Sequence, residues 1–215
     1  MAKSSPASKS VLKHSRNPAP TAALAKPIAS RIGGHIALDF CNTAGEHLAA
    51  HPEEKLLDWE SFIRWAAQAG LIEPETYPEL LHHCLPIAKI IQLRETIYRV
   101  GLAISRGDPI PERDLDSIRE RAGTPWPAIV IGRDGPRWRP DPSRASAELR
   151  ALLAGEALSL FCSPNSSRIG ICEGGNCGWL FLDESRGKRR RWCDMKDCGN
   201  KAKARRYYQQ QHEQK

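Results

Sequence analysis

Apolar residues between residues 58 and 161 recur every three or four positions, which is the spacing of one face of an α-helix. The first helix has an N-cap candidate in Asp58 and a stop signal in Gly70. Further helices are predicted to begin at Pro74, Pro86 and Pro111 and over residues 143–161. Helix 143–161 has a wide apolar arc, which places it at the centre of a helical core.

Shorter stretches have the patterns of strands. Residues 128–139 predict a β-hairpin that turns near Asp134–Gly135, and residues 169–171 and 179–182 predict a second, smaller hairpin. Residues 35–43 fit two patterns, because apolar residues alternate there and also lie one helical turn apart. The pattern therefore leaves strand and helix both open for this segment.

Three polar residues, Asp39, Asn42 and Thr43, lie beside the apolar positions of that segment. Side chains of these types commonly cap helices and form turns. The alternative is that they form the floor of a pocket for a small molecule. Both interpretations are kept as expectations.

Four of the seven cysteines form two pairs of equal spacing, Cys172-x4-Cys177 and Cys193-x4-Cys198. A pair of thiolates can wrap one side of a zinc ion, and two pairs complete a closed tetrahedral shell, which is typical of structural zinc. An iron–sulfur cluster would use the same ligands, and two disulfides are a further alternative. No secretory signal peptide is visible, so we expect the protein in the reducing cytoplasm, where disulfides are rare. Among the three alternatives, one zinc ion is therefore favoured. Cys41, Cys84 and Cys162 are predicted to be buried apolar residues.

Positive charge is concentrated near the second cysteine pair. The formal net charge is +7, and residues 186–206 contain ten Lys or Arg but two acids. Such a cluster favours a polyanionic partner, and most of its groups should contact phosphates; a merely solvated surface is the alternative. The candidate nucleic-acid contacts are Arg186, Lys188, Arg189, Arg190 and Arg191 in a loop, and Lys201, Lys203, Arg205 and Arg206 on a helix. Asn200 is expected to cap that helix, and Ala204 and Tyr208 to pack on the cysteine turns.

The first 29 residues are rich in Ser, Ala, Pro and Lys and contain no acid. Such a segment buries too little apolar surface to order itself, so it is predicted to be a disordered basic tail. No apolar run approaches the length of a membrane span, so no membrane partner is expected.

The stretch CGWLFLDESRGKRRRWCDMKDCGNKAKARRYY resembles the C-terminal module of the CGNR-type zinc finger family. The stretches LDFCNT and AAQAGLI resemble the ABATE domain that accompanies this module. The resemblance implies zinc, DNA binding and a role in stress-induced transcription regulation, mostly in bacteria. The family's Cys-Gly-Asn-Arg appears here as Cys198-Gly199-Asn200-Lys201, and lysine keeps the charge but lacks the planar fork of arginine.

These observations predict an α+β, mainly α fold in two domains. Residues 30–165 are expected to form a helical ABATE-like sensor or dimerisation domain with one β-hairpin, and residues 168–210 a treble-clef-like zinc finger. The expected function is a cytoplasmic, nucleoid-associated, DNA-binding transcription regulator, with a small-molecule effector and a homodimer as further expectations. Alternatives are RNA or ribosome binding, and protein binding by the zinc module. An enzyme that uses Asp39, Asn42 or His47 is disfavoured, because no nucleophile–base pair or phosphate loop is visible.

Overall fold

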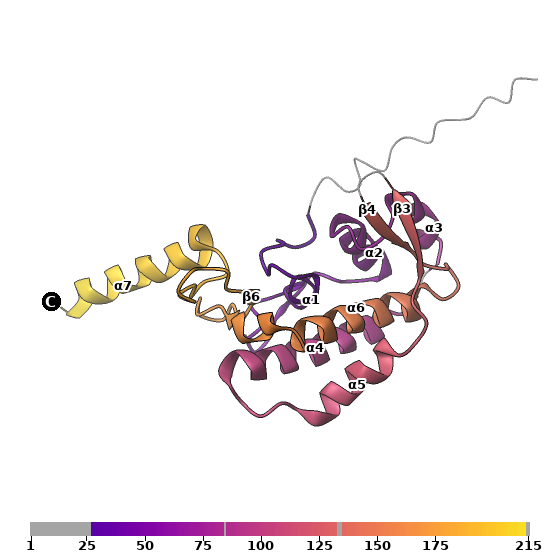
Figure 1. Cartoon of the computed structure of the whole chain (residues 1–215). Helices are drawn as coiled ribbons and strands as arrows, with labels where there is room; N and C mark the ends of the chain where they lie inside the picture. Colours follow the sequence, from indigo (N-terminus) through magenta and orange to yellow (C-terminus); the bar gives the residue numbers. More distant parts are fainter. Residues whose placement is uncertain (1–26, 84, 133–134, 214–215) are drawn as a thin grey trace, which may run out of the picture.

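The computed structural model describes residues 27–83, 85–132 and 135–213, and its fold is mainly helical (Figure 1). The helices are α1 (Ile36–Cys41), α2 (Trp59–Gln68), α3 (Tyr77–Leu81), α4 (Ala88–Arg106), α5 (Glu112–Ala122), α6 (Ala145–Phe161) and α7 (Asn200–Glu213). The strands form antiparallel pairs: β1 (Ala44–Gly45) with β2 (Glu53–Glu54), β3 (Ala128–Gly132) with β4 (Gly135–Arg139), and β5 (Ile169–Ile171) with β6 (Leu180–Leu182). The predicted α+β, mainly α class is confirmed.

The main core is built from side chains of α1, α2, α4 and α6, and α5 adds Ile118 to it. Helix α6 is buried around most of its circumference, as its wide apolar arc predicts. In the segment of residues 35–43, Ile36–Cys41 form a helix, and no strand is present there. Leu38 and Phe40 are both fully buried there, because α1 is covered on several sides and is not divided into a buried and a solvent-exposed face.

Local capping residues act as the sequence indicates. Asp58 accepts a hydrogen bond from the Ser61 backbone N–H at 2.8 Å, and the Ser61 hydroxyl accepts one from the Asp58 backbone N–H at 3.0 Å, which closes a capping box at the start of α2. Gly107 ends α4 in the left-handed conformation, with φ of 70°. The turn predicted near residues 134–135 of the first hairpin falls partly on residues 133–134, which lie outside the described residues.

The chain joins the helical body before residue 30. The Ile28 backbone N–H donates to the Gln68 side chain at 3.0 Å, and Ala29 is buried. Residues 1–26, on which most of the predicted basic tail falls, lie outside the described residues. No helix of the described ranges is long and apolar enough to cross a membrane.

Strand β6 belongs to two separate clusters of side chains. Leu180 and Leu182 pack into the main helical core, together with Ile169 of β5. Trp179, just before the strand, and Phe181 instead pack with Cys172 of the first pair and with both cysteines of the second pair. Because successive side chains of a strand point to opposite faces, this strand joins the two clusters directly. The predicted linker at residues 163–167 forms a short 3₁₀ turn (Pro164–Arg168) that leads into β5.

Candidate metal centre and nucleic-acid interface

Two tight turns bring the paired cysteines together. The first follows β5, where the Cys172 N–H donates to the Trp179 carbonyl at 2.8 Å and Cys177 lies between them in the chain. The second is a turn of π-helix, Met195–Gly199, capped by Asp194, whose carboxylate accepts from the Lys196 backbone N–H at 2.8 Å. The Glu173 N–H donates to the Arg191 carbonyl at 2.9 Å and ties the two turns together.

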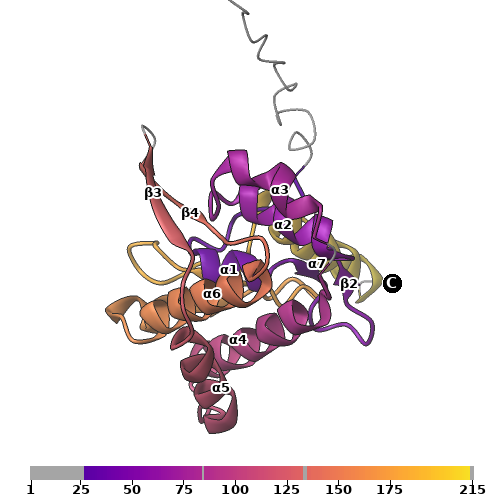
Figure 2. The ribbon, with the colours of Figure 1, turned by 90° about the vertical axis from the view of Figure 1, so that its right-hand side faces the viewer.

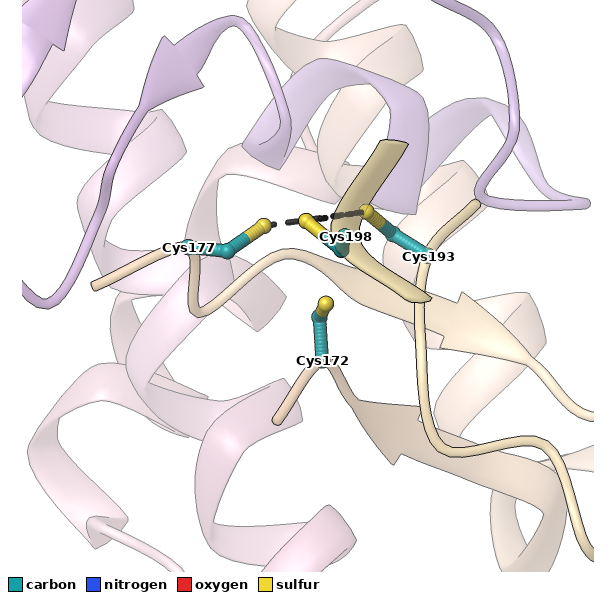
Figure 3. Close-up of side chains that lie close together, drawn as sticks. All are labelled: Cys172, Cys177, Cys193 and Cys198. Atoms are coloured by element: carbon teal, nitrogen blue, oxygen red, sulfur yellow. Dashed lines mark hydrogen bonds between the residues drawn. The ribbon is translucent and has the colours of Figure 1, made fainter. Parts of the chain in front are cut away.

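The four sulfur atoms converge on one centre (Figure 3). All lie within 4.8 Å of one another, and the Cys193 sulfur is 3.7 Å from that of Cys177 and 3.6 Å from that of Cys198. Tetrahedral zinc with Zn–S bonds of about 2.3 Å requires sulfurs about 3.8 Å apart. The residues present therefore fit one zinc ion in a closed, structural site.

Close packing around the sulfurs explains one glycine of the first turn. A Cβ atom at Gly174 would lie 2.7 Å from the Cys198 sulfur and 3.1 Å from that of Cys172, which no side chain tolerates. Hydrogen bonds from the Cys177 and Cys193 thiols lower the pKa of Cys172, whereas the hydrogen bond to Cys172 raises the pKa of both of those thiols, and burial raises that of Cys198.

The zinc module is bonded directly to the helical body. The side-chain amide of Asn42 donates to the Leu180 carbonyl at 2.8 Å and accepts from the Leu180 N–H at 3.0 Å, and it is fully buried. The Trp179 indole donates to the Ala44 carbonyl at 2.7 Å, and the Tyr98 hydroxyl donates to the Gly178 carbonyl at 2.9 Å. The His47 N–H donates to the Cys177 carbonyl at 2.8 Å. The turn that bears two of the cysteines is therefore held by α1, α4 and the segment between them.

Asp39 and Thr43 also bond to protein groups. The Asp39 carboxylate accepts from the Gly33 N–H at 2.8 Å, and burial raises its pKa. The Thr43 hydroxyl donates to the Phe40 carbonyl at 2.7 Å and accepts from the Arg94 guanidinium at 3.2 Å. These contacts match the capping and turn interpretation, and a ligand pocket at Asp39, Asn42 and Thr43 stays a prediction.

His47 is held between two residues of α4. Its ring stacks on Tyr98 with centroids 3.5 Å apart, and its Nε2 lies 2.9 Å from the Glu95 carboxylate. Burial alone would raise the pKa of Glu95, but the bonds from His47 and Arg94 outweigh it and lower the pKa. Arg94 in turn makes a two-fold contact to Glu54, at 2.7 and 2.6 Å. This network ties β2 to α4 next to the metal centre.

The loop cations are mostly bonded within the module. The Arg190 guanidinium donates to the carbonyls of Leu182, Trp192, Cys193 and Ile32, and it lies 4.3 Å from the centre of the Phe181 ring. Arg191 pairs with Glu173, and the Lys188 ammonium contacts Ser167 at 3.2 Å. Arg190 thus stabilises the loop and points into the module, which the charge pattern alone does not reveal.

Five candidate cations are exposed and have neither an ion-pair partner nor a side-chain hydrogen bond among the described residues. Arg186 and Arg189 lie in the loop, and Lys203, Arg205 and Arg206 lie on α7. Lys201 on the same helix pairs with Asp197 at 2.9 Å. The free cations therefore concentrate on α7.

Helix α7 projects from the rest of the chain (Figure 1). Asn200 does not cap it: its backbone is helical, and its side chain donates to the Lys196 carbonyl at 3.0 Å. Ala204 and Tyr208 face the cysteine turns as expected, since both line one groove with Cys177, Cys193 and Cys198, but they remain exposed, Tyr208 by 64%. The cap belongs to Asp194, because the preceding π-turn runs into α7 without a break.

A groove of about 940 Å³ separates one face of α7 from the β1–β2 segment. Its charged lining residues balance in sign, so together they carry no net charge. They are Glu46, Glu53, Asp197, Lys55, Lys201 and Arg205. At 100° per residue, Lys203 and Arg206 lie on the opposite face of α7, which therefore carries unbalanced positive charge.

A mainly helical body bonded to a four-cysteine site for one zinc ion defines a zinc-finger protein. Residues 168–211 match the model of the CGNR zinc finger, and residues 34–164 match the ABATE model, described as "Putative stress-induced transcription regulator". The second match covers more than half of the chain, so the protein belongs to the ABATE family. A search among curated proteins finds no match to the chain. The predicted resemblance is confirmed for both parts.

Proposed function

We propose that the zinc module binds duplex DNA and that the protein regulates transcription, with the helical body as a sensor or dimerisation domain. The observation that supports DNA binding best is the set of free, exposed cations on a metal-held module, three of them on one projecting helix. These cations have no anionic partner among the described residues, and the phosphates of DNA would supply one. A cytoplasmic, nucleoid-associated location follows from this role.

Salt dependence tests the proposal. Five phosphate contacts, one for each free cation, give a log–log slope of affinity against salt of about −4.5. The triple change Lys203→Ala, Arg205→Ala and Arg206→Ala should reduce the slope to about −1.8, because it removes three contacts. Fluorescence anisotropy of a labelled duplex measures both slopes, with zinc content checked in each variant.

A charge-matched control comes from the body. Lys89, Arg106 and Arg113 are exposed cations of α4 and α5, and changing all three to Ala alters the net charge equally. This control should leave the slope unchanged. Equal losses in the two triple variants, or a slope near zero in the wild type, would refute a localised DNA site.

Competition separates DNA from RNA as the partner. A structured RNA that displaces the duplex at a lower concentration than unlabelled duplex does would favour the RNA-binding alternative. Genome-wide DNA crosslinking of the tagged protein then tests the regulatory role, which predicts enrichment at promoters.

A further inference from the structure

The β3–β4 hairpin stands away from the helices, with β3 on its outer side (Figure 2). The far edge of β4 is covered, because Ile72 forms a parallel bridge with Trp138 and the Glu73 N–H donates to the Trp138 carbonyl at 2.9 Å. Across the described ranges, the far edge of β3 makes no backbone hydrogen bond. Strand β3 is therefore an open sheet edge, which is a template for pairing.

The register decides which peptide groups of β3 point outward. Ile131 lies opposite Pro136, and proline has no N–H to donate, so this pair is the non-hydrogen-bonded type. Trp138 lies opposite Ile129, and its carbonyl points away from β3 and accepts from Glu73. The Ile129–Trp138 pair is therefore also of the non-hydrogen-bonded type, as the alternation along an antiparallel ladder requires. The N–H and C=O groups of Ile129 and Ile131 therefore point away from β4.

The same two residues expose apolar side chains. Ile129 is 54% exposed and Ile131 is 74% exposed, and Trp126 at the base of the hairpin is 42% exposed. Natural proteins commonly protect an edge strand with lysine, proline or an inward-pointing charge. The sequence of β3, Ala-Ile-Val-Ile-Gly, contains none of these.

We propose that β3 pairs antiparallel with β3 of a second copy of the chain, so that two hairpins form one four-stranded sheet. The two-fold axis passes beside Val130, and Ile129 of each protomer lies opposite Ile131 of its partner. In this register Ile129 of each protomer and Ile131 of its partner form a hydrogen-bonded pair. In each pair, the N–H of one residue donates to the C=O of the other in both directions, which makes two bonds. The isoleucines of both copies gather on one face of the sheet.

The chemistry of β3 favours a second copy over an unrelated strand. Two identical antiparallel strands are self-complementary, as a two-fold interface requires. Like charges facing each other across the axis would oppose this pairing, and β3 carries no charge. The contact is smaller than a standard interface of about 1,600 Å², so we expect a dimer that dissociates on dilution. The pairing does not depend on DNA binding and is tested without nucleic acid.

Sedimentation velocity of the full-length, zinc-loaded protein over a concentration series is the first test. The wild type should pass from monomer to dimer, and Ile131→Lys should remain monomeric at every concentration. Leu57 supplies the matched control, because this apolar side chain is 75% exposed on another surface. Leu57→Lys should dimerise like the wild type. A wild type that stays monomeric, or a dimer that survives Ile131→Lys, would overturn the proposal.

Disulfide cross-linking tests the register. In a non-hydrogen-bonded pair the Cα atoms lie about 4.5 Å apart, which is within reach of a disulfide. Val130→Cys, in a Cys162→Ser background that removes an exposed thiol, should therefore form a covalent dimer under mild oxidation. Ile129→Cys should cross-link far less, since its copy in the partner is displaced by two residues, or about 7 Å along the strand. Equal cross-linking of the two variants would refute the pairing centred on Val130.

Discussion

The basic loop at residues 186–191 and the basic helix at residues 201–206 have similar charge but different surroundings. In the loop, Arg190 donates to four backbone carbonyls and Arg191 pairs with Glu173. On the helix, Lys203 and Arg206 have no ion-pair partner among the described residues and face solvent. A basic stretch in a sequence can thus stabilise the fold in one half and remain available to a partner in the other.

Metal removal should abolish the difference between the two regions and have the largest effect. The loop and α7 are both fixed by the second cysteine turn, so Cys193→Ser should leave neither in place. We expect loss of zinc, loss of detectable DNA binding, and a reduced thermal midpoint for the helical body. Elemental analysis, anisotropy and circular dichroism measure the three effects. Full zinc content in this variant would contradict the four-cysteine site.

Arg190→Ala should destabilise the loop and leave all five free cations in place. It removes charged hydrogen bonds to four carbonyls, and we expect a loss of about 3 kcal/mol in the free energy of unfolding. Urea denaturation of the zinc-loaded protein measures this loss. The neighbouring Arg189→Ala is the control and should unfold like the wild type, because its side chain is exposed and has no ion-pair partner in the described chain. Equal stability of the two variants would refute the internal role of Arg190.

Arg206→Ala should show the opposite behaviour to Arg190→Ala. We expect unchanged stability, because the side chain is exposed, together with a salt slope that is less steep by about 0.9. Paired urea and anisotropy measurements on one preparation would check this. A destabilised Arg206→Ala variant with an unchanged slope would reverse the assignment of the two regions.

Lys201→Arg should produce the smallest effect. Lysine and arginine carry the same charge, so this exchange should leave the salt slope unchanged. Arginine restores the family's tetrapeptide and adds a planar fork, which should give a modest gain in DNA affinity, measured by anisotropy. Because Lys201 pairs with Asp197, Lys201→Ala should also leave the slope nearly unchanged, and a slope less steep by about 0.9 in that variant would place Lys201 among the free cations.

Apart from the expected cap at Asn200, the features that depend on neighbouring residues were predictable from the sequence. The cap at Asp58, the end of α4 at Gly107, both hairpins and the four-cysteine cluster all follow from local residue types and spacing. Features set by distant residues were not predictable. Asn42 meets the Leu180 backbone 138 positions away, and the pattern of residues 35–43 does not encode that partner. The burial of Arg190 and the projection of α7 likewise depend on packing that charge counts do not contain.

The alternating side chains of β6 have a consequence for protein engineering. Because Leu180 and Leu182 fill the helical core while Phe181 packs with the metal-binding cysteines, the finger cannot be exchanged as a cassette at the boundary near residue 165. A chimera would have to transplant the partners of this strand as well, Asn42 and Gly33 among them. Since the side chains of Leu180 and Leu182 fill the core of the body, a different residue at either position should require a compensating change among the core residues that surround it.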